Sequence, residues 1–371
     1  MSFLPTVSPG ALLIVAQLVG CVSTASNGDS IEPSFIEVTL QSEALGTQES
    51  PLPFAGDDDG DGENDPQDWA ISVRTLDRTQ ALYSFEGDLT LAVRPGGVEG
   101  NPIIHVSGGE WSGTVPIRNA FGPTRIWASD EGDQDIDSAR VPSWATGVTD
   151  PIWYALPTIA EMQATSNPET NALAGEYAEL RAVDRQIVVT ALTTNGFWAT
   201  DILDDPGSGN SLFIYTFSKP ADDVVLGAQV VSLAGIDQEY LATTQLYWPN
   251  LDIGTETLPV PDAILLDPGV GCDENAMEGL EAARVDLLNW QVPADFGPGS
   301  DDYADFEAYG QWPITLGSCT VYVESGVTVP DFYPPDHAGE TITRVSGMVN
   351  QIFSQAVIIV LDASDLDAPT L

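Results

Sequence analysis

Residues 184–248 carry the pattern that most constrains the fold of this chain. They contain five short runs in which apolar and polar residues alternate, or in which Val, Ile and aromatic residues predominate, each bounded by Gly, Asp, Asn or Pro. Alternation with a period of two is typical of half-buried β-strands, and five such strands in about 65 residues predict a small closed barrel. The runs are 186–192, 196–202, 211–217, 228–236 and 240–247.

Four pieces of this segment, in order, are IVVTAL, NGFWATD, SLFIY and VVLGAQVVSLAGIDQEYLATTQL. Their order resembles the OB-like module of secreted bacterial nucleases and related surface proteins. We expect Gly227 in the turn before the fourth strand, and Gly235 where that strand must bend to close a barrel. The resemblance does not imply nuclease activity, because the catalytic domain of those proteins is a separate large α/β unit.

The pattern begins again after residue 271. EGLEAARV, at 278–285, resembles the opening strand of a second OB-like module, and Gly347 falls near the end of a later strand as Gly235 does. The later strands are predicted at 306–312, 318–323, 340–350 and 351–361. We therefore predict two related five-stranded barrels, at 156–250 and 251–371.

Strands of a different kind are expected at 69–155. Short runs separated by Gly, Pro and Asn turns predict a β-sandwich, and GTVPIRNAFGPTRIWASD resembles the last hairpin of a surface Ig-like domain. The predicted fold class is therefore all-β, an Ig-like sandwich followed by two OB-like barrels. The sandwich runs are 71–76, 89–93, 103–106, 113–118 and 124–129.

The N-terminal stretch predicts export and lipid anchoring. Residues 11–19 form an apolar run of signal-peptide length, followed by the sequence LVGC that ends at Cys21. This resembles a bacterial lipoprotein signal peptide with a lipobox, which implies cleavage before Cys21 and attachment of palmitate-type acyl chains. Val22, where Asp would favour the inner membrane, points to the outer membrane. The stretch before the run has no Lys or Arg, and a chance Cys after an apolar N-terminus is the alternative.

The polar segment 22–56 reads as a flexible tether, and an acid-rich loop follows it at 57–68. Carboxylates at alternate positions and a Gly at the sixth position match a twelve-residue calcium loop, which resembles a type-3 thrombospondin-like repeat. The alternative is a solvated acidic linker. The predicted calcium ligands are Asp57, Asp59, Asp61, Glu63, Asp65 and Asp68.

Acidic residues dominate the charge of the chain. Asp and Glu number 56 against 11 Lys and Arg, and the formal net charge is -45. Such a field repels nucleic acid and favours cations, although solubility or a saline habitat explains it equally well. Three Cys are present. If Cys21 is acylated, Cys272 and Cys319 remain as the natural disulfide pair in an exported protein.

Catalytic motifs are missing from the sequence. It has no Gly-rich phosphate loop, no G-x-S-x-G, no H-E-x-x-H and no C-x-x-C, and its two His are far apart. We therefore predict a non-enzymatic, calcium-stabilised, lipid-anchored envelope protein that presents β-modules to a protein or glycan partner. The alternative is a binder of oligosaccharide or single-stranded nucleic acid. Its aromatic ligand face would be Phe197, Trp198, Phe213, Tyr215 and Phe217.

Overall fold

The computed structural model describes residues 35–42, 44–53, 66–129, 146–163, 173, 177–181, 185–352 and 355–367, within one compact unit, Pro33–Leu371. These ranges are mostly β-strand with a few short helices, which confirms the predicted predominance of β-structure. Three large clusters of buried apolar side chains are present, one in a two-sheet region and one in each of two barrels. Within the described ranges, every helix is too short or too polar to cross a membrane.

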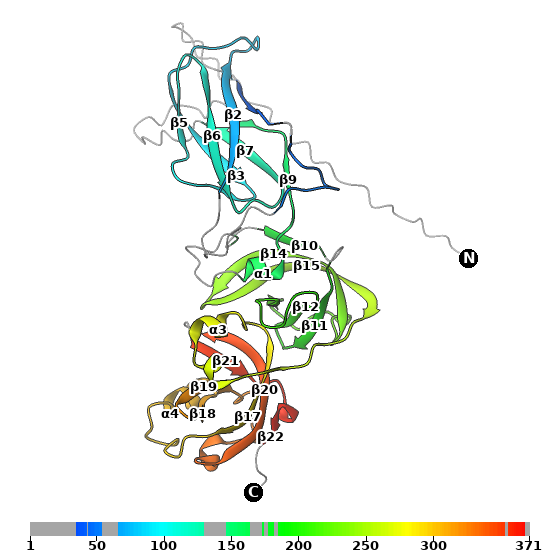
Figure 1. Cartoon of the computed structure of the whole chain (residues 1–371), viewed down its shortest axis with the longest axis vertical. Helices are drawn as coiled ribbons and strands as arrows, with labels where there is room; N and C mark the ends of the chain where they lie inside the picture. The colour runs from blue at the N-terminus through cyan, green and yellow to red at the C-terminus, as the bar shows by residue number, and fades with distance from the viewer. Residues whose placement is uncertain are drawn as a thin grey trace, which may run out of the picture. The chain divides into compact units, whose positions relative to one another are not determined.

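The first region consists of two sheets around one core. One sheet has the order β1-β2-β6-β4, and the other has the order β5-β3-β7-β8 with β9 also paired to β7 (Figure 1). Buried and more exposed side chains alternate along the strands, so Ile71 on one sheet and Leu91 and Ile126 on the other enter the same cluster. The strands are β1 Phe35–Leu40, β2 Gln67–Leu76, β3 Gly87–Arg94, β4 Gly97–Val98, β5 Ile103–Val106, β6 Glu110–Arg118, β7 Gly122–Ser129, β8 Gly147–Val148 and β9 Ile152–Tyr154.

Strand β1 corrects the predicted tether at 22–56. Its six residues pair antiparallel with β2, from Phe35 opposite Leu76 to Leu40 opposite Ile71. Ile36 and Val38 are buried in the core between the sheets. The composition of the segment is polar on average, but its apolar residues alternate with polar ones, which lets a single edge strand bury one face.

The second region is a closed five-stranded barrel. Its strand order is β11-β12-β13-β15-β14, and the ring closes because β14 also pairs with β11. Strand β10 pairs with β14 but is not part of the ring. Strands β13 and β15 are parallel, with Tyr215 opposite Tyr247, and the other pairs are antiparallel. The elements are α1 Ile159–Met162, β10 Tyr177–Arg181, β11 Ile187–Leu192, β12 Gly196–Asp201, β13 Ser211–Tyr215, β14 Ala228–Tyr240 and β15 Thr243–Thr257.

Both predicted glycine positions in this barrel are confirmed. Gly227 precedes β14 with a positive φ of +81°, which favours glycine. The pairing of β14 with β15 shifts register between Ala234 and Ile236, and a Cβ on Gly235 would lie 3.1 Å from the Tyr247 carbonyl oxygen. The small residue therefore lets the long β14 bend close to β15, as barrel closure requires.

The third region repeats the same ring as β17-β18-β19-β21-β20, closed by pairing of β17 with β20. A Cβ on Gly347 in β20 would lie 2.5 Å from the Ile359 carbonyl oxygen in β21, which matches the position of Gly235 in the first barrel. The elements are β16 Ile264–Leu265, α2 Pro268–Gly271, α3 Glu274–Glu278, β17 Arg284–Gln291, α4 Tyr303–Tyr309, β18 Gln311–Leu316, β19 Cys319–Glu324, the 3-10 helix η2 Pro334–His337, β20 Thr341–Ile352, β21 Gln355–Ile359, the 3-10 helix η3 Ala363–Asp365 and β22 Leu366–Asp367.

Two predicted strands of this barrel are wrong in part. The segment 278–285 begins in helix α3, and β17 starts only at Arg284. The segment 306–312 begins in helix α4, whose Tyr303 and Phe306 lie three residues apart and both pack on the barrel core. Gly310 ends α4 in the left-handed conformation, with φ of +74°, before β18 starts. A helical face and a strand face are hard to distinguish in so short an aromatic run.

Candidate ligand-binding face

Five aromatic rings form a continuous row on the outer surface of the first barrel. The ring centroids of Trp198 and Phe213 are 4.9 Å apart, those of Phe213 and Tyr215 are 6.5 Å apart, and those of Tyr215 and Phe217 are 4.6 Å apart. Trp248 completes the row at 4.6 Å from Phe217. We call these five residues the aromatic row.

Strand alternation places the row outside the barrel. Leu212 and Ile214 of β13 are fully buried in the barrel core, so Phe213 and Tyr215 between and after them face outward. The same alternation makes Phe197 wrong as a ligand-face residue: its side chain is fully buried in the core.

Trp198, the neighbour of Phe197, points outward and pairs in register with Phe213. It is nevertheless only 3% exposed, because it packs against Ala282 and Met348 of the second barrel. The accessible part of the row therefore lies toward Phe217 and Trp248.

The open end of the row is exposed and held in an uncommon backbone conformation. Phe217 is 47% exposed and Trp248 is 63% exposed. Both have positive φ, +63° and +54°, in the left-handed region that bulky residues rarely occupy. Strain of this kind tends to be retained at functional sites. Trp248 is absent from the predicted ligand face, because its contact with Phe217 joins the end of β13 to β15 and is not visible in the local sequence pattern.

Amide groups lie beside the rings. Gln245 of β15 is opposite Phe213 in the parallel register, and its Nε2 donates to Oε1 of Gln238 on β14 at 3.1 Å. Such groups offer both hydrogen-bond donors and acceptors next to an apolar surface. Gln245 is only 6% exposed, so these amides lie toward the covered end of the row. The combination of aromatic rings in contact with a few fixed polar groups is typical of ligand sites.

The row is particular to the first barrel. The barrels can be aligned on one inward pair of residues, which is Phe197 and Ile214 in the first barrel and Trp312 and Val323 in the second. Counting along the strands from this pair, the outward positions of Trp198, Phe213 and Tyr215 correspond to Pro313, Tyr322 and Glu324. Tyr322 donates its hydroxyl to Asp302 Oδ1 at 2.9 Å, and burial followed by this contact raises the pKa of Tyr322 to about 12.

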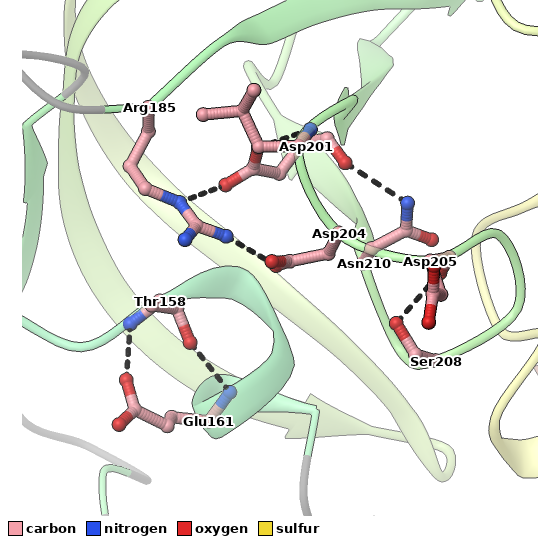
Figure 2. A network of polar contacts seen from close by, with 9 residues as sticks. Thr158, Glu161, Arg185, Asp201, Asp204, Asp205, Ser208 and Asn210 are labelled. Atoms are coloured by element: carbon pink, nitrogen blue, oxygen red, sulfur yellow. Dashed lines mark hydrogen bonds and ion pairs between the residues drawn. The ribbon is translucent and has the colours of Figure 1, made fainter.

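The cationic residues of 184–248, Arg185 and Lys219, are both compensated by carboxylates. Arg185 Nε donates to Asp201 Oδ2 and its Nη2 donates to Asp204 Oδ2, as Figure 2 shows. Lys219 Nζ lies 3.1 Å from Asp222 Oδ1. Burial alone would lower the pKa of Arg185, but the hydrogen bonds to Asp204 and Asp201 outweigh it and raise that pKa. The described residues 185–248 therefore offer little uncompensated positive charge to a phosphate backbone.

The Arg185 cluster lines a cleft of about 640 Å³, together with Asp201 and residues 153–159. Asn210 Nδ2 donates to the Asp201 carbonyl at 2.9 Å, and a reciprocal Thr158–Glu161 capping box starts helix α1 nearby (Figure 2). Because Arg185 and Asp201 already bind each other, we interpret this network as a support for the loop after β12.

A buried carboxyl group lies where the two barrels touch. Glu281 is fully buried, and its Oε1 accepts the backbone N–H of Thr244, near the start of β15, at 2.7 Å. Burial first, and then the charges of Glu278 and Glu239, raise the pKa of Glu281 well above its ordinary value. The contact between the barrels therefore favours the neutral form of Glu281.

Most of the other predicted sites lie outside the described residues. These are Cys21 and the calcium-loop residues Asp57, Asp59, Asp61, Glu63 and Asp65. Asp68, the last predicted calcium ligand, is exposed in β2 opposite Pro116. Among the residues that the structure describes, no group of three or more His, Cys, Asp or Glu is arranged to hold a metal ion.

Cys272 and Cys319 are joined by a disulfide that links the end of α2 to the start of β19. His105 pairs with Asp88 at 2.7 Å in the sandwich, and His337 pairs with Glu340 at 2.8 Å in the second barrel, so the two imidazoles serve separate regions. No protein family, curated protein or solved structure matches this chain.

Proposed function

We propose that this protein is a non-enzymatic, lipid-anchored cell-envelope protein whose first barrel binds an oligosaccharide through the aromatic row. One observation carries the proposal: a row of aromatic rings, each tilted against the next, extends along the outer face of β12, β13 and β15 and ends in the exposed, strained Phe217 and Trp248. A monomeric surface rarely keeps two large exposed rings in contact at unfavourable backbone angles without a ligand to bind.

The chemistry of the row favours sugars over nucleic acid. One face of a pyranose ring carries C–H groups and packs on an aromatic ring, while its hydroxyls hydrogen-bond to water or to polar groups at the edge of the ring surface. Bases stack on rings as well, but single-stranded nucleic acid also needs a positive groove along its backbone. Arg185 and Lys219 are paired with carboxylates, and the chain carries a formal net charge of -45. A neutral glycan meets no electrostatic penalty from this field.

The finer fold assignments are part of the same proposal. The ring order, with its one parallel pair and its repetition in the second barrel, supports two OB-like modules, whose second and third strands commonly form the binding face. The two-layer packing supports an Ig-like sandwich. The sequence pattern and the closed strand order of the two barrels together support the resemblance to the barrel modules of secreted nucleases. They also support module boundaries near 156 and 251.

Anchoring and calcium complete the proposal. The lipobox-like LVGC supports acylation of Cys21 and attachment to the outer membrane, and the spacing of 57–68 supports a calcium loop between anchor and sandwich. The barrels would then present their binding face at a distance from the membrane. Replacement Cys21→Ser should move the protein from the membrane fraction to the soluble fraction.

The test is co-sedimentation of the protein with insoluble polysaccharides, including chitin, cellulose and purified bacterial cell wall. Trp248→Ala and Phe217→Ala should each weaken binding at least about fivefold, because stacking of a base on one aromatic ring contributes about 1–3 kcal/mol and we expect a similar contribution for a pyranose ring. Tyr309→Ala is the matched control, since Tyr309 is 65% exposed but lies on α4 of the second barrel. Equal loss in all three variants, or binding that none of them changes, would refute a site on the aromatic row.

A further inference from the structure

A second, smaller recess lies where the first barrel, the connector after β15 and the second barrel meet. It has a volume of about 310 Å³, at the lower end of the usual range for small-molecule sites. Its floor comes from β11, β12 and β13, and its walls from the connector and from Ala283 and Arg284. We call it the hydroxyl cleft, after the three side chains Thr190, Thr200 and Ser211 that line its floor.

These three hydroxyls form a ladder across neighbouring strands. Thr200 Oγ1 lies 2.8 Å from Ser211 Oγ and 3.4 Å from Thr190 Oγ1. Thr200 and Ser211 are register partners on β12 and β13. The pairing of β11 with β12 shifts between Val189 and Ala191, so Thr190 is an extra residue in β11. Such bulges redirect a side chain and are enriched next to binding sites.

The ladder retains hydrogen-bonding capacity. Thr190, Thr200 and Ser211 are 4%, 7% and 2% exposed, so their hydroxyls have limited access to bulk water. Each hydroxyl offers one donor and two acceptor positions, and the two contacts within the ladder use only part of this capacity. Buried polar groups of this kind favour a partner that supplies further hydrogen bonds.

Two of the three charged groups at the cleft are already paired with other residues. Asp204 accepts from Arg185, and Arg284 Nη2 donates to Asp365 Oδ1 at 2.5 Å while its Nε donates to Ser346 at 3.2 Å. A ligand charge of either sign beside these two groups would have to disrupt one of the pairs. The third group, Asp262 on the connector, is exposed, and an ion pair between a ligand and so exposed a carboxylate contributes little. The cleft is therefore suited to an uncharged ligand.

The opposite wall is apolar and stiff. Pro206, Pro259, Val260, Pro261 and Ile264 line it, and the fixed φ of the prolines restricts movement of the connector. A wall of C–H groups that faces a row of hydroxyls complements a ring with one apolar face and several hydroxyl groups.

We propose that the hydroxyl cleft binds a small, uncharged polyhydroxy molecule of monosaccharide size. Thr190, Thr200 and Ser211 would exchange hydrogen bonds with the hydroxyls of this ligand, and the proline wall would cover its C–H face. This site is separate from the aromatic row and does not depend on it. Thr200 follows Trp198 by two residues on β12, and the second barrel covers Trp198, so the cleft adjoins the covered end of the row and not the exposed rings of Phe217 and Trp248.

The experiment compares glucose, glucuronate and glucosamine, which share a pyranose ring but are neutral, anionic and cationic. Binding to the full chain is titrated by saturation-transfer NMR in the Trp248→Ala variant, so that the exposed end of the aromatic row does not contribute. Glucose should bind more tightly than either charged sugar. Thr200→Val, which keeps the side-chain shape, and Ser211→Ala should each weaken glucose binding about fivefold, the effect of one lost hydrogen bond.

Two further variants make the result decisive. Thr114→Val, on an exposed position of β6 in the sandwich, is the matched control and should bind glucose unchanged. Val260→Trp should abolish binding by filling the cleft from the connector, and it stays informative if a ladder variant fails to fold. The proposal is overturned if glucose shows no saturable binding, if a charged sugar binds more tightly, or if the folded ladder variants and Val260→Trp bind glucose as Thr114→Val does. Loss of polysaccharide binding in Trp248→Ala, with glucose binding retained, would separate the two sites.

Discussion

Replacement of Phe197 by Ala tests whether this side chain supports the barrel core or contacts ligand. Phe197 is fully buried among Leu212, Ile214 and Leu246, so truncation removes a large core side chain and leaves a cavity. Phe-to-Ala changes at such sites destabilise proteins by about 3–5 kcal/mol. Phe217, at the open end of the aromatic row, is 47% exposed. Its truncation should change stability by no more than about 0.5 kcal/mol.

Native-state hydrogen exchange provides the assay, because it reports opening of one barrel in a chain with several regions. Backbone amides of β11–β15 should exchange about 10²- to 5 × 10³-fold faster in Phe197→Ala, whereas Phe217→Ala should change their exchange about twofold. Amides of β2 and β6 in the sandwich serve as the internal control. Near-equal exchange in the two variants would show that Phe197 does not support the core, and the inward assignment of this residue would be wrong.

Three further predictions concern the second barrel and the acidic loop. Burial raises the pKa of Glu281 in the folded state, so the folded state holds this proton more tightly than the unfolded state does. The contribution of Glu281 to the free energy of unfolding is therefore fully present below the ordinary pKa of 4.5 and is lost as the pH rises through the raised pKa. Between about pH 5 and 8 the free energy of unfolding of Glu281→Gln should therefore decrease less than that of the parent protein, measured as the shift of the urea midpoint with pH. Equal decreases in the two proteins would contradict this. The disulfide joins Cys272 and Cys319, which are 47 positions apart in the sequence, and so closes a long loop. Its reduction should therefore destabilise the second barrel by about 4 kcal/mol. Thiol titration of the denatured, unreduced Cys21→Ser variant would disprove the bond if two free thiols appeared. Calcium should protect 57–68 from proteolysis relative to chelator, and Asp61→Asn should weaken this protection; equal cleavage in calcium and chelator would argue for a plain acidic linker.

Much of the first barrel can be predicted from local pattern. All five expected strands of 184–248 are present with shifted ends, because period-two alternation reports directly which residues a half-buried strand turns inward. Gly227 and Gly235 are found at the predicted turn and bend, because a positive φ and a close backbone approach both favour glycine. The second barrel is less predictable because α4 and β18 share one aromatic run.

The ligand face shows where local pattern ends. Alternation predicts that Phe197 and Trp198 face opposite sides, but only closure of the barrel decides that Phe197 is inside. His337 is 8% exposed and stacks on Phe332 at a centroid distance of 4.7 Å. Phe332 in turn lies 5.5 Å from Trp312 in the core of the second barrel, so burial of this imidazole depends on a contact with a distant strand.

The sequence by itself determined the strands, their inward and outward periodicity, the bend glycines and the acidic charge of this protein, because each depends on residues close together in the chain. The tertiary structure alone decided that Trp248 joins the aromatic row, that the second barrel covers Trp198, and that Thr190, Thr200 and Ser211 share one cleft. The physical reason is that these contacts join strands that are sequentially distant, and their geometry follows from ring closure and from the packing of one barrel on the other.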